Sequence, residues 1–231
     1  MHHKRVALVT GANQGIGLQI ARDLAAADLA VLVGSRDLER GTEAVGMIVG
    51  DVHAIQLDVT DHASIAAAAE RIRDEFGRLD VLVNNGAISN TRWLPGMSLE
   101  EYAQTVRAST ASLDEIRAVW ETNVFGPLAV FQIMLSLLRE APYASIVNVS
   151  SAAGSLAVNA NPAFEWRHTF NPVYPASKTA LNAMTLAMAI ELESIAIKVN
   201  AVSPGFTRPT STATRALKPL KRARARPFVL R

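Results

Sequence analysis

Residues 6–17 read Val6-Ala7-Leu8-Val9-Thr10-Gly11-Ala12-Asn13-Gln14-Gly15-Ile16-Gly17 and decide the fold. The four apolar residues predict a buried strand, and the glycines after it open a helix expected over 17–27. In such a turn Gly11 permits the tight bend, Gly15 lets a pyrophosphate approach the backbone, and Gly17 lets the helix pack closely on the strand. The stretch therefore indicates a dinucleotide-binding βαβ unit. A glycine-rich turn without a ligand is the alternative interpretation.

The rest of the chain continues this alternation of short β-branched runs and longer alanine-rich amphipathic stretches. Strands are expected at Val6–Val9, Leu29–Val33, Val52–Leu57, Val81–Val83, Ile146–Val149 and Ile197–Val202, and helices at Gly17–Ala27, Ser64–Phe76, Val119–Leu138 and Pro175–Leu192. Strands that alternate with helices form a parallel sheet that is covered on both faces. We therefore predict an α/β fold with a Rossmann-type doubly wound parallel sheet in three αβα layers.

Two connections, 88–117 and 152–173, are long for this fold. Long loops beyond strand ends often hold substrates, although an irregular insertion without function is the alternative. Their large apolar residues could line a substrate pocket or could simply pack: Trp93, Met97, Phe164, Trp166 and Phe170.

Length and composition exclude several classes of protein. At 231 residues the chain fits one domain with at most an appendage, and 49% hydrophobic with 19% charged residues is typical of a globular protein. Cysteine is absent, which excludes disulfides, thiolate metal sites and cysteine nucleophiles. The five histidines lack metal-ligand spacing, so no metal is predicted. No apolar run reaches the roughly 18 residues of a membrane span, and no signal-peptide block opens the chain. We expect a soluble, cytoplasmic protein without a membrane partner.

The positive net charge belongs to one end of the chain. Residues 208–231 carry eight of the 23 basic residues and no acidic residue. Residues 1–207 hold the other 15 basic residues against all 21 acidic ones, a net charge of −6. We therefore expect a Rossmann-fold domain over 1–207 and a basic tail over 208–231. The basic residues of the tail are not interleaved with aromatic ones, so no nucleic-acid partner is predicted.

The second predicted strand is followed by a candidate for cofactor selectivity. The sequence there reads Gly34-Ser35-Arg36. An acidic residue would hold the ribose 2′-hydroxyl of NAD, whereas an arginine suits the 2′-phosphate of NADP. Arg36 therefore favours NADP(H), with NAD(H) as the second choice. A merely solvated surface arginine is the alternative interpretation.

Tyr174 and Lys178 stand four residues apart, so on a helix they share one face. Pro175 suits the first helical turn, where its missing N–H is not needed. A phenol with a pKa of about 10 is a poor acid-base group at neutral pH, and we expect the neighbouring ammonium to lower that pKa. Such a pair alone is common on protein surfaces. The glycine-rich turn and Ser151 upstream favour a catalytic interpretation.

Seven short motifs occur in order between residues 5 and 207. They are Thr10-Gly11-x-x-x-Gly15-x-Gly17, Leu57-Asp58-Val59-Thr60, Asn84-Asn85-Gly86-Ala87, Thr122-Asn123-Val124, Val149-Ser150-Ser151, Tyr174-x-x-x-Lys178 and Pro204-Gly205. The chain thereby resembles the classical short-chain dehydrogenase/reductase family, and specifically its carbonyl-reductase-like branch. The resemblance implies an NAD(P)-dependent oxidoreductase that interconverts an alcohol with an aldehyde or ketone, and a small-molecule substrate.

The resemblance also implies catalytic roles. Ser151 would hydrogen-bond the substrate carbonyl, Tyr174 would transfer the proton, and Lys178 would hold the ribose hydroxyls while lowering the tyrosine pKa. Asn123 would support a water that links Lys178 to solvent. Ser150 is the alternative serine, but strand alternation points it to the other face.

The cofactor contacts that we predict lie along the ends of several strands. By resemblance, Asp58 would contact the adenine, Asn85 the adenosine ribose, and Pro204-Gly205 the nicotinamide end. The full predicted set is Gly11, Asn13, Gln14, Gly15, Ile16, Gly17, Ser35, Arg36, Asp58, Val59, Asn85, Gly86, Ala87, Tyr174, Lys178, Pro204 and Gly205.

Three local departures from the family pattern matter. Gly86-Ala87 reverses the usual Ala-Gly order, which would tighten the floor of the cofactor site. Gln14 replaces a basic residue that is frequent in NADPH-preferring relatives, so Arg36 would set that preference alone. The segment between Ser151 and Tyr174 is longer than usual. In the carbonyl-reductase branch such an insertion is associated with monomers, so a monomer and a homo-oligomer both stay open.

The fourth departure is the end of the chain. The family continues past Pro204-Gly205 into a helix and a last strand, whereas residues 209–231 show neither pattern. We hypothesise a reading-frame slip near Arg208, because codons allowed for 209–230, read out of phase, can spell a family-like continuation that includes Thr-Asp-Leu-Asn. The sheet would then lack its usual last strand and expose an edge. The alternative function is therefore a catalytically impaired nucleotide-binding protein. An intact frame encoding the same tail in the genes of close relatives would contradict the slip.

Overall fold

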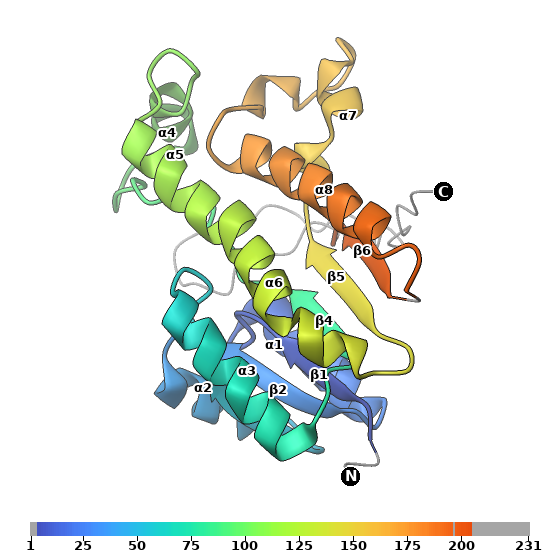
Figure 1. Ribbon diagram of the computed structural model, residues 1–231. Coiled ribbons are helices and arrows are strands. Elements are labelled where there is room, and N and C mark those ends of the chain that lie inside the picture. Colours follow the sequence, from blue (N-terminus) through green and yellow to red (C-terminus); the bar gives the residue numbers. More distant parts are fainter. Residues whose placement is uncertain (1–3, 196, 205–231) are drawn as a thin grey trace.

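A computed structural model describes residues 4–195 and 197–204 (Figure 1). The strands are β1 (Val6–Val9), β2 (Ala30–Ser35), β3 (Val52–Gln56), β4 (Val81–Asn84), β5 (Ser145–Val149) and β6 (Lys198–Val202). The α-helices are α1 (Gly15–Ala26), α2 (Leu38–Val45), α3 (His62–Phe76), α4 (Leu99–Thr105), α5 (Leu113–Trp120), α6 (Gly126–Arg139), α7 (Leu156–Ala160) and α8 (Tyr174–Glu191). The remaining helical turns are the π-helical turn η1 (Glu121–Phe125) and the 3-10 turns η2 (Ala152–Gly154) and η3 (Arg167–Thr169).

The six strands form one parallel sheet in the order β3-β2-β1-β4-β5-β6. The order reverses between β1 and β4, which are hydrogen-bonded neighbours. In open parallel sheets this switch point opens a crevice at the carboxyl ends of the strands, and ligands bind there. The predicted α/β fold and doubly wound parallel sheet are confirmed.

Helices cover both faces of the sheet. Val6 and Leu8 of β1 pack into one core with buried residues of α3, α6 and α8. Ala7 and Val9, which point the opposite way along the same strand, pack with α1 and α2. Figure 1 shows α3, α6 and α8 together in front of the sheet. The three αβα layers are therefore confirmed, and each face of the sheet has its own apolar core.

Local capping explains where several helices begin and end. Asp61 caps α3 by accepting a hydrogen bond from the N–H of Ala63 at 2.9 Å, and Gly77 ends this helix in the left-handed region at φ 75°. Helix α2 was not among the predicted helices. Its cap resembles that of α3, because the Asp37 carboxylate accepts from the N–H groups of Glu39 and Arg40.

The two long connections contain more regular structure than expected. The first, 88–117, includes α4 and the first part of α5, and the second, 152–173, includes η2, α7 and η3. The helix predicted over Val119–Leu138 was too short, because α5, η1 and α6 follow one another without a break from Leu113 to Arg139. This helix is long and apolar enough to cross a membrane, but 56% of its most apolar window is buried inside the protein. We therefore interpret it as a core helix.

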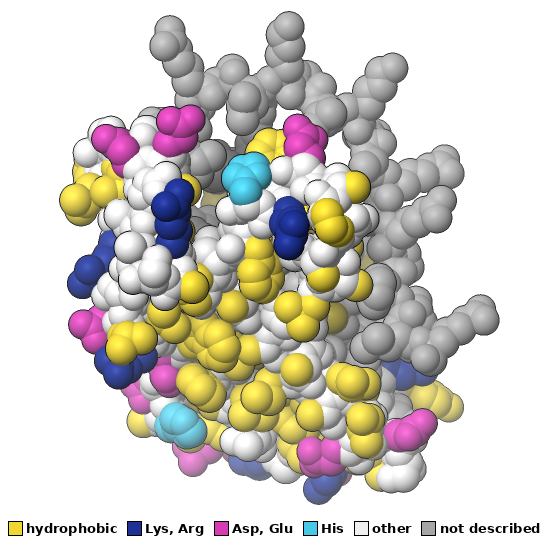
Figure 2. Space-filling view, turned by 90° about the horizontal axis from the view of Figure 1, so that it is seen from above, with side chains coloured by type: hydrophobic (Ala, Val, Ile, Leu, Met, Phe, Trp, Pro, Cys, Tyr) yellow, Lys and Arg dark blue, Asp and Glu magenta, His cyan; other side chains and the backbone are white. Residues whose placement is uncertain are grey.

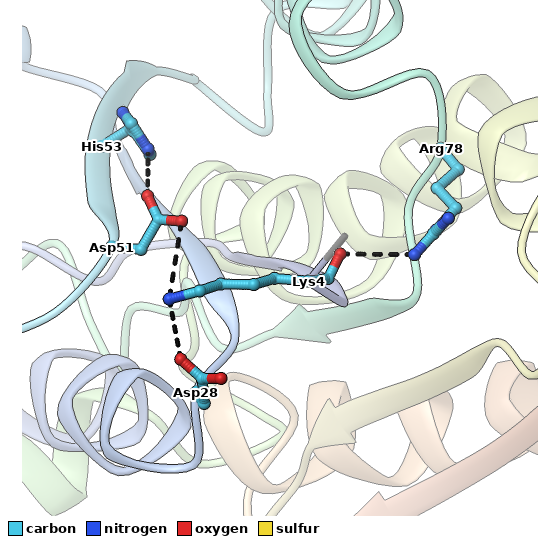
Figure 3. A network of polar contacts seen from close by, with 5 residues as sticks. All are labelled: Lys4, Asp28, Asp51, His53 and Arg78. Carbon is cyan, nitrogen blue, oxygen red and sulfur yellow. Dashed lines mark hydrogen bonds and ion pairs between the residues drawn. The ribbon is translucent and has the colours of Figure 1, made fainter. Parts of the chain in front are cut away.

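The amino ends of β1 and β3 are tied together by polar contacts (Figure 3). Lys4 Nζ lies 2.7 Å from Asp28 and 3.9 Å from Asp51, and His53 Nε2 lies 2.8 Å from Asp51. Arg78 donates to the carbonyl of Lys4 at 3.3 Å. Such partly exposed pairs contribute about 0–1 kcal/mol each. They join the segments that precede the strands, at the end of the sheet opposite the carboxyl ends.

Strand β6 ends the sheet among the described residues, since it pairs only with β5 there. The predicted basic tail over 208–231, the proposed frame slip and the cofactor contact Gly205 all lie outside the described residues. The expected loss of a last strand therefore stays a prediction.

Candidate active site

A cleft of about 270 Å³ opens at the carboxyl ends of β1, β2 and β4. Nine of the predicted cofactor residues line it: Gly11, Asn13, Gln14, Ser35, Arg36, Asp58, Val59, Gly86 and Ala87. Six further lining residues were not predicted: Asp37, Arg40, Leu57, Thr60, Ile88 and Thr122. The cleft lies where the strand order reverses, so its position follows from the topology of the sheet.

The glycines of the first turn are required for different reasons. A Cβ on Gly11 would lie 2.7 Å from the Cα of Gly86, and a Cβ on Gly17 would lie 2.4 Å from Asn85 Nδ2. Gly15 adopts a left-handed φ of 60°, yet nothing would lie within 4 Å of its Cβ. Gly11 and Gly17 therefore let the turn pack against the end of β4. Gly15 leaves open space at the N-terminus of α1.

The N-terminus of α1 suits an anion. Gln14, its N-cap residue, makes no side-chain hydrogen bond to the helix, and its first turn contains no acidic residue. The first N–H groups of a helix lack intrahelical partners and carry a partial positive charge. Together with the open space at Gly15, these N–H groups fit the pyrophosphate of a dinucleotide.

Asn85 and Thr10 join the first turn to the end of β4. Asn85 Nδ2 donates to the carbonyls of Thr10 and Gly11, both at 3.0 Å. Thr10 Oγ1 accepts the N–H groups of Asn85 and Gly86, also at 3.0 Å. The side-chain amide of Asn85 therefore joins the turn after β1 to the end of β4 through two hydrogen bonds. The reversed Gly86-Ala87 order is not demanded by space at position 86, since a Cβ there would meet Thr10 Oγ1 at an ordinary 3.4 Å.

The rim of the cleft holds two arginines. Arg36 follows β2, as predicted, and Arg40 lies in the first turn of α2 and lines the same cleft. Arg40 Nε is 3.5 Å from Asp37, which also caps α2. Arg40 was not among the residues predicted from the sequence. The signal for it was the Asp37 cap, which starts a helix and so brings residue 40 back towards residue 36.

Tyr174 and Lys178 lie in the first turns of α8, as predicted. Lys178 Nζ is 5.7 Å from the centre of the Tyr174 ring and donates to the carbonyl of Val149 at 2.8 Å. Lys178 is only 3% exposed. The carboxyl end of β5 and the start of α8 are thus joined through the lysine ammonium.

The two adjacent serines point in different directions, as strand alternation predicted. Ser150 is buried, and its hydroxyl donates to Asn182 Oδ1 at 2.6 Å, on α8. Ser151 is half-buried and caps η2 through the N–H of Ala153 at 3.2 Å, and its side chain interacts with that of Tyr174. The structure therefore brings Ser151 rather than Ser150 to the tyrosine hydroxyl. Gly154 makes this approach fit, because a Cβ there would lie 2.7 Å from the backbone of Lys178.

Burial changes the pKa of both members of the pair. Desolvation raises the pKa of Tyr174, and the hydrogen bond with Ser151 opposes this increase without cancelling it. Desolvation therefore outweighs the lowering influences on the Tyr174 pKa in the protein without cofactor, and the expected lowering by Lys178 stays a prediction. Desolvation also lowers the pKa of Lys178 to about 8. At neutral pH the tyrosine carries its proton and most of the lysine is charged.

Asn123 is fully buried in the π-helical turn η1. Its Oδ1 accepts the N–H of Ile88 at 2.9 Å, and its Nδ2 donates to the carbonyl of Ile88 at 2.8 Å and to Ser177 Oγ at 3.1 Å. Ser177 Oγ donates in turn to the carbonyl of Tyr174 at 2.7 Å. Asn123 therefore connects the segment after β4 to the first turn of α8. π-Helical turns often occur at functional sites.

Other predicted residues lie around these groups. Ile16, Gly17 and Asn85 belong to the turn behind the cleft, and Pro204 follows β6 beside Ser203, whose hydroxyl accepts from the N–H of Ala152 at 2.9 Å. The apolar loop residues differ in exposure. Trp93, Trp166 and Phe170 are exposed, whereas Met97 packs against a small core of its own. Figure 2, which looks down on the end that carries α4 and α7, shows apolar side chains gathered across this face.

Comparison with known proteins decides the family. The family model described as short chain dehydrogenase matches residues 5–220. The chain belongs to the short-chain dehydrogenase/reductase family. This confirms the resemblance stated from the motifs.

Individual relatives agree with this assignment. Short-chain dehydrogenase anuI of Penicillium roqueforti (strain FM164) is 33% identical over 235 residues, which cover 98% of this chain and 87% of that protein. The (-)-isopiperitenone reductase of Mentha piperita is 30% identical over 294 residues, which cover 95% of this chain and 92% of that protein. The solved structure of a metagenomic short-chain oxidoreductase in complex with NADP has a TM-score of 0.69 and 30% identity, covering 88% of this chain and 83% of that one.

This short-chain dehydrogenase/reductase is therefore an NAD(P)-dependent enzyme that acts on CH–OH or C=O groups of small molecules. The cleft geometry fits that assignment. The open turn at Gly15 follows β1, and Ser151 follows β5 beside Tyr174 and Lys178 of α8.

The buried lysine predicts a pH effect on stability. Because the pKa of Lys178 is about 8 in the folded protein and 10.5 when unperturbed, the unfolded chain binds an extra proton between these values. The cofactor-free wild type should therefore gain roughly 1–3 kcal/mol of stability relative to Lys178→Met as the pH rises from 7.5 to 10. Denaturant unfolding of both proteins across this range measures the difference. A stability difference between the two proteins that does not change with pH would contradict the lowered pKa of Lys178.

Proposed function

We propose that this short-chain dehydrogenase/reductase reduces aldehydes or ketones with NADPH, or catalyses the reverse alcohol oxidation, with Tyr174 as general acid or base. The observation that carries the proposal is the arrangement of Tyr174, whose side chain interacts with that of Ser151 and lies beside the ammonium of Lys178. This places a proton donor, a second hydrogen-bond donor and a positive charge in one group. The carbonyl-reductase-like branch remains part of this proposal.

The chain's own groups account for the proton transfer. The nicotinamide supplies the hydride in reduction when the cofactor is bound. Ser151 donates a hydrogen bond to the carbonyl oxygen, and Tyr174 gives its phenolic proton to that same oxygen as it becomes a hydroxyl. The raised pKa keeps Tyr174 protonated until then. The charge of Lys178 stabilises the phenolate that is left behind.

Asn123 positions Tyr174 through hydrogen bonds on the buried side of α8. Its contacts to Ile88 and Ser177 connect the wall of the cleft to the helical turn that carries Tyr174. Its amide makes three hydrogen bonds inside the protein, so it acts through positioning in the cofactor-free protein. A water between Lys178 and solvent, expected from the resemblance, belongs to the same proposal.

NADP(H) is the proposed cofactor. Arg36 and Arg40 both line the cleft near the end of β2, where the 2′-phosphate of a bound NADP would lie in this fold. Two guanidinium groups suit a phosphate, since arginine presents several N–H donors to its oxygens. The NADP complex of a structurally similar relative supports the use of this cofactor.

Catalytic impairment is the second candidate function. The observation that favours it is the position of β6, which has no partner on its outer side within the described ranges. A sheet that ends there would leave part of the substrate site open. Such a protein would bind NADPH but would not oxidise it with any carbonyl compound.

Replacing Tyr174 with phenylalanine tests the catalytic proposal. Tyr174→Phe removes the proton donor but keeps the ring, so NADPH oxidation with an aldehyde or ketone should fall by about 10²–10⁴-fold. The dissociation constant of NADPH, measured by its fluorescence, should stay within about twofold. Tyr143→Phe is the matched control, because Tyr143 is 77% exposed. Turnover by Tyr174→Phe at the wild-type rate would contradict the assigned role, and binding without turnover in the wild type would favour the second candidate.

A separate prediction concerns cofactor selectivity. Arg36→Ala and Arg40→Ala should each weaken NADPH binding by roughly 10–100-fold, because each removes a charge-assisted contact to the 2′-phosphate. NADH binding should change little, since NADH lacks that phosphate. Arg139→Ala, an exposed arginine at the end of α6, provides the control. Equal losses of NADPH and NADH affinity would show that the arginines do not read the 2′-phosphate.

A further inference from the structure

Glu115 is a buried carboxylate that the chemistry proposed above does not use. It lies on α5 and is 1% exposed. Its Oε1 accepts the N–H groups of Thr91 at 3.0 Å and Arg92 at 3.2 Å, and the hydroxyl of Tyr102 at 3.1 Å. Its Oε2 is buried and has no hydrogen-bond partner among the described residues. A buried carboxylate that is held by neutral donors is costly to keep, so packing alone is a poor reason for it.

The two backbone partners of Glu115, Thr91 and Arg92, belong to the segment that leaves the cleft. Ile88 lines the cleft and begins this segment, and Asn123 holds both its N–H and its carbonyl. Asn123 lies eight residues after Glu115 in the same continuous helix. Both residues face the segment 88–92, since each makes hydrogen bonds with its backbone. The helix therefore grips the segment 88–92 at two points, Asn123 at its start and Glu115 at its end.

The segment next carries an aromatic residue towards solvent. The Trp93 ring stacks on Tyr102 with centroids 4.9 Å apart and is 41% exposed. Tyr102 in turn belongs to a small core with Val173, the residue that precedes Tyr174. Burial and the charge of Glu115 raise the pKa of Tyr102, so its hydroxyl keeps the proton that it donates to the carboxylate. Glu115 thus accepts hydrogen bonds both from the backbone just before Trp93 and from the hydroxyl of Tyr102, on which the Trp93 ring stacks.

We propose that Glu115 is a positioning residue for the carbonyl substrate, because it fixes Thr91–Trp93 as a wall of the substrate site. The inference rests on the proposed function and deepens it. Asn123 holds the cofactor end of the segment independently of Glu115. Loss of Glu115 should therefore disturb substrate binding and leave cofactor binding and proton transfer largely intact.

Three substitutions separate this role from general stabilisation. Glu115→Ala removes all three acceptor contacts, whereas Glu115→Gln keeps the shape and a neutral oxygen. Asp114→Asn is the matched control, because Asp114 is the neighbouring carboxylate with an 82% exposed side chain and a surface contact to Arg117. For the full chain, we measure KM and kcat with an aldehyde or ketone that the wild type reduces, the NADPH dissociation constant, and hydrogen exchange of the Thr91 and Arg92 amides.

Glu115→Ala should raise KM about tenfold or more, with kcat within about threefold and NADPH binding within about twofold, because substrate binding alone loses its wall. Glu115→Gln should raise KM about threefold, since hydrogen bonds to a neutral acceptor are weaker than those to a carboxylate. Exchange at Thr91 and Arg92 should accelerate about tenfold in the alanine variant and less in the glutamine variant. Asp114→Asn should match the wild type in all measurements.

Several results would overturn the proposal. They are wild-type exchange rates in Glu115→Gln, a KM no higher than that of Asp114→Asn, or an equal rise in KM and in the NADPH dissociation constant. If Glu115→Ala does not fold, Glu115→Gln decides. If the wild type reduces no carbonyl compound, the proposed function fails, and the exchange rates still decide whether Glu115 anchors the segment.

Discussion

The two hydrogen bonds from Asn85 Nδ2 to the carbonyls of Thr10 and Gly11 hold together the two strand ends between which the cleft lies. They are formed only at close approach, and that approach requires glycine at positions 11 and 17, where a Cβ would collide with Gly86 and with Asn85 itself. The candidate cofactor site thus depends on close packing of the backbone at these two strand ends. Within the same turn, Gly11 and Gly17 are closely packed, whereas Gly15 faces open space.

Helix α8 carries Tyr174 and Lys178, the candidate catalytic residues. Lys178 donates a hydrogen bond to the carbonyl of Val149, and Gly154 allows the turn after β5 to pack against the helix. Ser177 is hydrogen-bonded to both Asn123 and the carbonyl of Tyr174. These contacts bury the pair, and burial raises the pKa of Tyr174 while lowering that of Lys178. The same packing that positions the tyrosine therefore keeps its proton in place.

Much of this arrangement could be predicted because it has a local signal. The period of apolar residues revealed the strands, and the glycine spacing located the turn. The π-helical turn around Asn123 has no such signal, since no side-chain cap marks its start at Trp120 within the continuous helix. The net rise of the Tyr174 pKa could not be predicted from the sequence, because desolvation depends on neighbours distant in sequence. Glu115 was missed for the same reason, as its partners lie 13 to 24 residues away.

The central claim is that one cofactor spans the glycine turn after β1 and the tyrosine on α8. A crystal structure of the protein with bound NADP+ tests this claim most directly. We expect the pyrophosphate at the N-terminus of α1 next to Gly15, the 2′-phosphate at Arg36, and the nicotinamide beside the hydroxyl of Tyr174. A cofactor bound elsewhere, or a nicotinamide that lies away from Tyr174 with no space for a carbonyl group between Tyr174 and Ser151, would contradict the account.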